Sequence, residues 1–120
     1  MKNNTTGLKH FLKAFGYSID GFKWIIKKEA AFRHDILFAI LVIAITSYAT
    51  SFNFKKIAIV VASTFLLFIV ELLNSAIECV VDIVSPEFNI LAKAAKDMCS
   101  AAVFVAVVIV LFAMGVVIFS

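Results

Sequence analysis

The sequence predicts an all-α membrane protein with an N-terminal amphipathic surface helix and three transmembrane helices. Hydrophobic residues fill 63% of the 120 positions, whereas soluble domains average roughly 45–50% apolar residues. The mean hydropathy is +1.07. In addition, three apolar helical runs follow a first segment in which apolar and basic residues are interspersed. We expect a single domain covering residues 1–120, because this length is too short for two.

The first element is predicted over residues 8–28. Its apolar residues recur every three or four positions, as they do on one face of a helix, and lysines occupy the other faces. This pattern favours a helix that lies in the membrane surface. The alternative is an ordinary amphipathic helix packed on the others, and Gly16 and Gly21 are positions where it could bend. The apolar positions are Leu8, Phe11, Leu12, Phe15, Ile19, Phe22 and Ile26.

The three spans are predicted over residues 32–52, 56–84 and 98–119. The strictly apolar part of the first, about 36–49, is short for a bilayer core of about 30 Å. The second would measure about 43 Å at 1.5 Å per residue, more than the hydrocarbon requires. It ends at Ser85, because the residue before a proline is biased away from helix. Residues 85–97 form a short polar connection or the start of the next helix.

Basic residues are distributed unevenly about these spans. Nine of the eleven fall on the side that holds the N-terminus and the 85–97 connection, and two fall on the other. The positive-inside rule therefore predicts that the first side, with the N-terminus, is cytoplasmic. The nine are Lys2, Lys9, Lys13, Lys23, Lys27, Lys28, Arg33, Lys93 and Lys96, and the two are Lys55 and Lys56.

Polar side chains recur at helical spacing in the second half of the second span. Glu71, Asn74, Glu78 and Asp82 are separated by three, four and four residues, which places them on one helix face. A charged group at the centre of a bilayer costs about 2.5 to over 10 kcal/mol. Such groups therefore indicate a functional site, although each taken singly is also compatible with a contact between helices or a solvated position.

Other charged residues are expected at the same cytoplasmic face. Glu29 and Asp35 flank the start of the first span, and Lys96 and Asp97 precede the third. Carboxylates can bind a divalent cation through oxygen, and a lysine can neutralise phosphate. The combination favours Mg²⁺-dependent phosphoryl transfer. The glycine-rich phosphate-binding loops of P-loop enzymes and protein kinases are absent from the sequence, and three spans cannot easily enclose such a site, so we expect a homo-oligomer.

Several segments resemble the prokaryotic diacylglycerol kinase family. They are VELLNSAIECVVD (70–82), AKDMCSAAV (95–103), NNTTG (3–7), KAFGYS (13–18) and EAAFR (29–33). The resemblance covers nearly the whole chain. It implies a homotrimeric enzyme of the bacterial inner (cytoplasmic) membrane that uses MgATP to phosphorylate diacylglycerol to phosphatidic acid and so recycles lipid. No nucleic-acid partner is expected.

The resemblance also implies roles for individual residues. Glu71 would be the general base, with Asn74 helping to position the catalytic groups, and Glu29 and Glu78 would hold the Mg²⁺ that accompanies ATP. Nucleotide contacts are implied for His10, Tyr17, Glu29, Glu78, Glu87, Phe88, Asn89, Lys96 and Asp97. Diacylglycerol contacts are implied for Lys13, Ala14, Phe15, Gly16, Tyr17, Ser18, Ile19, Ala31, Phe32, Arg33, His34, Asp35, Glu71 and Ser100.

This sequence departs from the family pattern at four of its positions. Asn89 and Phe88 stand where histidine and tyrosine are common, His10 replaces a commonly basic arginine, and Cys99 replaces a usual glycine. Two alternatives remain open. One is an undecaprenol kinase, which shares the motif of the second span. The other is a small proton-coupled exporter with a glutamate embedded in the membrane, although such proteins usually need four spans.

Overall fold

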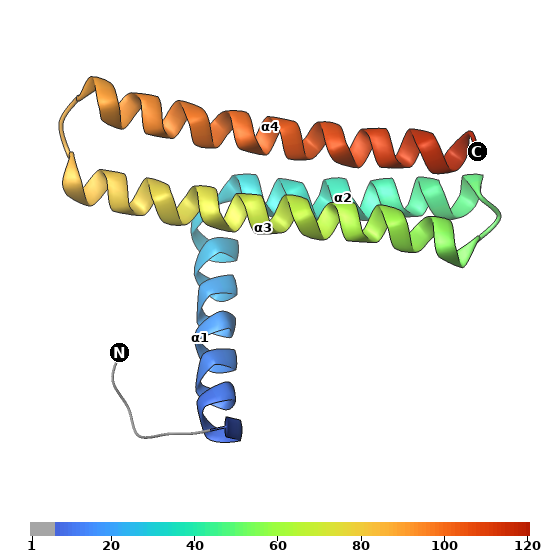
Figure 1. Cartoon of the computed structure of the whole chain (residues 1–120), viewed down its shortest axis with the longest axis horizontal. Helices are drawn as coiled ribbons and strands as arrows, with labels where there is room; N and C mark the ends of the chain where they lie inside the picture. Colours follow the sequence, from blue (N-terminus) through green and yellow to red (C-terminus); the bar gives the residue numbers. More distant parts are fainter. Residues whose placement is uncertain (1–6) are drawn as a thin grey trace.

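The computed structural model describes residues 7–120, which form four α-helices. The motif at 3–7 thus lies almost wholly outside the described residues. Helices α2, α3 and α4 run side by side, while α1 projects from them at a steep angle (Figure 1). The all-helical prediction is confirmed over the described range. The helix bounds are Gly7–Lys28 for α1, Ala30–Ala49 for α2, Phe54–Val84 for α3 and Ile90–Ile118 for α4.

The joint between α1 and α2 is a single residue. Glu29 adopts an extended backbone (φ −116°, ψ 109°), and its side chain makes no capping hydrogen bond. Helix α1 continues without a break through Gly16 and Gly21. It packs on the bundle through its C-terminal end, because Ile25 is its one buried residue. The sharp turn therefore lies at Glu29 and not at either glycine.

Over residues 7–120, three helices are long and apolar enough to cross a membrane, namely α2, α3 and α4. The fourth helix begins earlier than the predicted third span, which reduces the polar connection to residues 85–89. Asn89 starts this helix by accepting hydrogen bonds from the backbone N–H groups of Leu91 (2.8 Å) and Ala92 (3.2 Å). The following segment, rich in alanine and lysine, favours helix, so its polarity marks an exposed turn of α4 and not a loop.

The core of the bundle is formed by small and medium apolar residues, chiefly where α3 packs on α4. Most of the surface of each apolar helix remains exposed in the single chain. In a bilayer such a surface faces lipid or a neighbouring subunit. The core cluster comprises Val42, Val60, Leu67, Ala106, Val110 and Val117.

Helices α3 and α4 extend well beyond α2 at the end that carries their connection (Figure 1). Helix α3 has 31 residues and α2 has 20, a difference of about 16 Å in length. At the opposite end the Lys56 Nζ atom lies 3.3 Å from the Ser120 carbonyl oxygen, which brings the start of α3 beside the C-terminus. The second half of α3 therefore runs from the level of α1 outward to the 85–89 connection.

Candidate functional site

Glu71 lies on the buried face of α3, at the level where α1 and α2 meet the bundle. Only 5% of the Glu71 surface is exposed. The Asn74 Nδ2 atom donates a hydrogen bond to Glu71 Oε2 (3.2 Å). The carboxyl group of Asp35, on α2, is close enough to Glu71 for the two acidic groups to interact directly. The structure thus brings together three residues that the sequence singled out: Glu71, Asn74 and Asp35.

Two oxygen atoms of this group have no hydrogen-bond partner among the described residues. They are Asp35 Oδ2 and Asn74 Oδ1, and both are buried. A buried acceptor without a donor is costly. Two neighbouring carboxylates also repel each other unless a proton, a cation or a hydrogen-bond donor lies between them. The group is therefore suited to receive a ligand that brings a donor, such as a hydroxyl.

Farther along α3, Glu78 is half-buried and lies within electrostatic range of Glu29, at the α1–α2 joint. Because Glu29 uses no side-chain oxygen to cap α2, both carboxylates retain acceptor capacity. Glu78 also interacts electrostatically with Lys96. Within residues 7–120 there is no cluster of three or more His, Cys, Asp or Glu side chains arranged to hold a metal by themselves. A metal here would need oxygens from a ligand as well.

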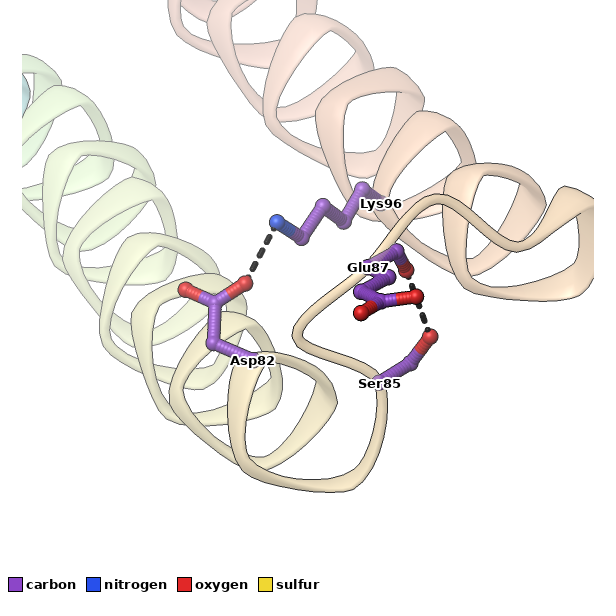
Figure 2. Close-up of polar contacts among 4 residues, drawn as sticks. All are labelled: Asp82, Ser85, Glu87 and Lys96. Atoms are coloured by element: carbon purple, nitrogen blue, oxygen red, sulfur yellow. Dashed lines mark hydrogen bonds and ion pairs between the residues drawn. The ribbon is translucent and has the colours of Figure 1, made fainter.

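A cavity of about 410 Å³ lies between the ends of α3 and α4, beside their connection. Lys96 Nζ lies 2.6 Å from Asp82 Oδ1 across the two helices (Figure 2). Lys93 and Asp97 form a second ion pair, 2.7 Å long, within α4. The lining residues are Val81, Asp82, Ser85, Pro86, Glu87, Phe88, Asn89, Ala92, Lys93, Lys96 and Asp97. The cavity thus gathers five of the residues predicted to contact nucleotide.

The connection itself is organised by short hydrogen bonds. The Ser85 hydroxyl donates to the Glu87 carbonyl oxygen (3.0 Å), as Figure 2 shows. Asn89 Oδ1 is engaged as the helix cap of α4. Phe88 is 83% exposed, so its ring is available for stacking but is not packed against other side chains in the single chain. Asn89 therefore has a structural role as the N-cap of α4, and its contact with nucleotide remains a prediction.

The N-terminal half of α1 is not brought to this cavity within one chain. His10 precedes Ile25, the one point of burial on α1, by 15 residues, or about 22 Å along the helix. The Ser18 hydroxyl donates to the Ala14 carbonyl of its own helix (3.1 Å). The residues of α1 predicted to bind substrates lie on an exposed helix: His10, Lys13, Ala14, Phe15, Gly16, Tyr17, Ser18 and Ile19.

The residues predicted to contact lipid at the start of α2 separate into two groups. Phe32 is buried, with its ring centroid 6.5 Å from that of Phe22 and 5.6 Å from that of Phe68. Arg33 donates from Nη1 to the carbonyl oxygens of Ile26 (2.6 Å) and Lys27 (3.3 Å). It thereby caps the end of α1. Ala31 and His34 on α2 are exposed, and so is Ser100, which lies on α4.

The sequence did not identify one charged residue of the cavity, Lys93, or the contact partner of Lys96. Lys93 entered the sequence analysis only through the charge distribution, although its spacing of four residues from Asp97 is typical of an ion pair on one helix face. Asp82 belonged to the polar stripe, but its contact with Lys96 depends on how α3 and α4 are joined. That contact follows from a connection of only five residues, 85–89.

Comparison with known proteins places the chain in a family. The family model for prokaryotic diacylglycerol kinase matches residues 16–119. The chain is 40% identical to a diacylglycerol kinase of Escherichia coli, covering 91% of this chain and 88% of that protein. It is 46% identical to a diacylglycerol kinase of Pseudomonas aeruginosa, covering 88% and 85%, and 39% identical to one of Haemophilus influenzae, covering 96% and 97%.

A helical membrane protein with acidic groups beside a lysine-lined cavity has the features of a membrane-embedded phosphotransferase. The chain belongs to the prokaryotic diacylglycerol kinase family and is therefore a lipid kinase.

Proposed function

We propose that this protein transfers the γ-phosphoryl group of MgATP to the free hydroxyl of diacylglycerol, yielding phosphatidic acid and ADP. The reaction would take place at the cytoplasmic face of the bacterial inner membrane and would return diacylglycerol to phospholipid synthesis. The relatives support this acceptor, since they are named diacylglycerol kinases. The observation that carries the proposal is the arrangement of acidic residues along α3, from the buried group of Glu71 to the exposed cavity that Asp82 lines.

Depth along α3 would separate the two substrates. Glu78 lies seven residues beyond Glu71 and Asp82 lies eleven beyond it, which corresponds to about 10 Å and 16 Å along the helix axis. The lipid hydroxyl, which stays near the bilayer, would reach the inner group of Glu71, Asn74 and Asp35. The nucleotide, which comes from water, would occupy the outer cavity beside Lys96.

Glu71 is the proposed general base. It accepts the hydroxyl proton of diacylglycerol, the hydroxyl oxygen bonds to the γ-phosphorus, and the bond from that phosphorus to the β–γ bridging oxygen breaks to release ADP. Asn74 holds the Glu71 carboxylate through its amide and presents its own oxygen to the acceptor. Lys96 would neutralise phosphate charge as a point cation. Positioning and electrostatics are the main contributions that a protein makes to phosphoryl transfer.

Glu29 and Glu78 are the proposed holders of Mg²⁺. Mg²⁺ is usually bound by one or two carboxylates together with substrate phosphates, not by an all-protein cage. The pair fits this requirement, because the two carboxylates interact and Glu29 is not used in capping. When bound, Mg²⁺ would offset negative charge on the β- and γ-phosphates.

A homotrimer is proposed as the working assembly. In one chain the exposed half of α1 lies away from the cavity, and the apolar faces of α2, α3 and α4 remain largely uncovered. A neighbouring copy could cover those faces and bring its own α1 to the site, which would account for the nucleotide contacts predicted for His10 and Tyr17. Helix α1 would then lie in the membrane surface.

The direct test is an assay of ATP-dependent lipid phosphorylation by the purified protein in mixed micelles. The Glu71→Gln variant should lower kcat for diacylglycerol by about 10²–10⁴-fold, the usual contribution of a general base. Its KM for MgATP should stay close to that of the wild type, because the outer cavity is intact. Asp20→Asn, which removes a carboxylate from exposed α1, serves as the matched control.

The same assay separates the rival functions. Undecaprenol is offered beside diacylglycerol, and a clear preference for the polyprenol would overturn the proposed acceptor. Undiminished activity in Glu71→Gln would contradict the proposed base. Absence of ATP turnover, together with proton-driven flux of substrate in liposomes, would favour the small exporter.

A further inference from the structure

Lys96 is held by a residue that lies on another helix and outside the predicted nucleotide contacts. Its ammonium lies 2.6 Å from Asp82 Oδ1, and the two residues come from α4 and α3 on either side of the 85–89 connection (Figure 2). Both side chains line the 410 Å³ cavity. The contact therefore fixes the position of one cation within the space proposed for the nucleotide.

The geometry of this pair leaves the ammonium able to bind phosphate at the same time. A lysine ammonium has three N–H donors, and the contact with Asp82 occupies one of them. The ion pair is substantially exposed, with side-chain exposure of 42% for Lys96 and 63% for Asp82. Exposed ion pairs contribute little to folding stability. Its main consequence is thus local: it restricts a long, flexible side chain.

Lys93 provides a comparison within the same cavity. Its ammonium is paired with Asp97 four residues later on the same helix, at 2.7 Å. That pair is directed along α4, whereas the Lys96 pair spans the gap between the two helices. Lys96 also lies within electrostatic range of Glu78, one of the two proposed metal-holding carboxylates. Lys96 therefore both lines the cavity and interacts electrostatically with the proposed metal position.

We propose that Asp82 is a positioning residue for nucleotide binding, which orients the Lys96 ammonium across the cavity between α3 and α4 before the phosphates arrive. It acts through Lys96 and does not touch the reacting atoms. The ligand chemistry is a nucleoside triphosphate, whose phosphates take the two remaining ammonium donors. This inference rests on the proposed function, since it names a further residue of the same nucleotide site.

The first test compares Asp82→Asn with the wild type in the lipid kinase assay. Loss of orientation should raise KM for MgATP by about threefold to tenfold, as expected for one weakened charge-assisted contact. The kcat and the KM for diacylglycerol should change by less than about twofold, because the inner group is untouched. Asp82→Glu, which keeps the carboxylate, should restore KM for MgATP most of the way. Asp20→Asn removes an equal charge elsewhere and should change none of these parameters.

A double-mutant cycle then distinguishes positioning from structural support. In a Lys96→Met background, Asp82→Asn should have no further effect on kcat/KM for MgATP, because the side chain through which it acts is gone. Equal losses in both backgrounds would overturn the proposal. So would a KM for MgATP that is unchanged in Asp82→Asn, or a loss in Asp82→Asn that follows a fall in thermal stability and is not rescued by Asp82→Glu.

Equilibrium titration with a non-hydrolysable ATP analogue and Mg²⁺ separates this inference from the proposed function, since it requires no lipid. Weaker binding of the analogue by Asp82→Asn would support the inference even if the wild type failed to phosphorylate diacylglycerol. That failure would overturn only the proposed lipid reaction. Equal binding by both proteins, with lipid phosphorylation intact in the wild type, would overturn the inference alone.

Discussion

Polar residues inside this bundle differ in how their hydrogen bonds are satisfied. The hydroxyls of Ser63 and Thr64 donate to carbonyl oxygens of their own helix, at 2.6 Å from Val60 and 2.7 Å from Val61. Such groups are easily tolerated within a helix. Glu71 and Asn74 instead hydrogen-bond to each other, and the Asn74 Oδ1 acceptor remains without a partner among the described residues. The sequence alone could identify this pair, because charge and amide groups at helical spacing in an apolar run are costly whatever the tertiary structure.

The contact partners of other polar residues could not be predicted in this way. Asp82 and Lys96 are 14 residues apart, and their meeting depends on the length of the 85–89 connection and the rotation of two helices. Hydrophobic periodicity predicts neither the length of the connection nor the rotation of the helices. Thr46 is a similar case: it lies near the end of α2 among residues compatible with a membrane interface, yet it is fully buried.

Thr46 gives a prediction about stability. Its Oγ1 atom is buried and has no hydrogen-bond partner in the described part of the chain. Valine has nearly the same shape and carries no hydroxyl, so Thr46→Val should raise the free energy of unfolding, by about 1 kcal/mol or more, by removing an unsatisfied buried group. The measurement is the thermal midpoint in detergent. Thr64→Val, which discards a hydroxyl that is hydrogen-bonded, is the control and should give no gain; equal midpoints for Thr46→Val and the wild type would contradict the prediction.

At the scale of elements, the sequence located all four helices and placed the break between the first two within residues 29–31, but it did not predict that the turn is a single residue. Periodicity predicted a helix over 8–28, and the structure has one over Gly7–Lys28. The one-residue turn at Glu29 carries no glycine or proline signal, and the two glycines of α1 lie within the unbroken helix. The turn is stabilised from outside, because Arg33 on α2 donates to two of the carbonyls that the last turn of α1 leaves without helical partners.

Arg33 should therefore be important for the order of this joint. Replacing it by glutamine should raise amide hydrogen exchange over the last turn of α1, residues 25–29, by about tenfold, because a charge-assisted hydrogen bond is worth on the order of 1.4 kcal/mol. Exchange measured by mass spectrometry on the purified protein checks this. Lys28→Gln removes a cation from the same turn and should leave exchange unchanged. If both variants exchange alike, the capping role is wrong.

At the scale of the whole molecule, composition and helix length were sufficient to predict three membrane-capable helices, which the structure contains. The steep angle of α1 to the bundle and the extension of α3 and α4 beyond α2 (Figure 1) follow from packing, and no single segment of sequence specifies them. The oligomeric state is likewise not specified by a single chain, because its exposed apolar faces can pack against lipid or protein alike. The charge distribution does predict an orientation, because the positive-inside rule depends on the basic residues of whole loops and not on contacts.

Orientation yields the last prediction. The predicted topology assigns nine basic residues to the side of the N-terminus and of residues 85–97, against two at the other end, where the start of α3 contacts Ser120. In a chain whose Cys79 and Cys99 are replaced by alanine, a membrane-impermeant maleimide applied to spheroplasts should label Ser120→Cys and spare Pro86→Cys until the cells are lysed. Labelling of both before lysis would argue against three crossings. The reverse pattern would place the cavity of Lys96 on the side of the membrane that lacks ATP, and would remove the physical basis for a nucleotide site there.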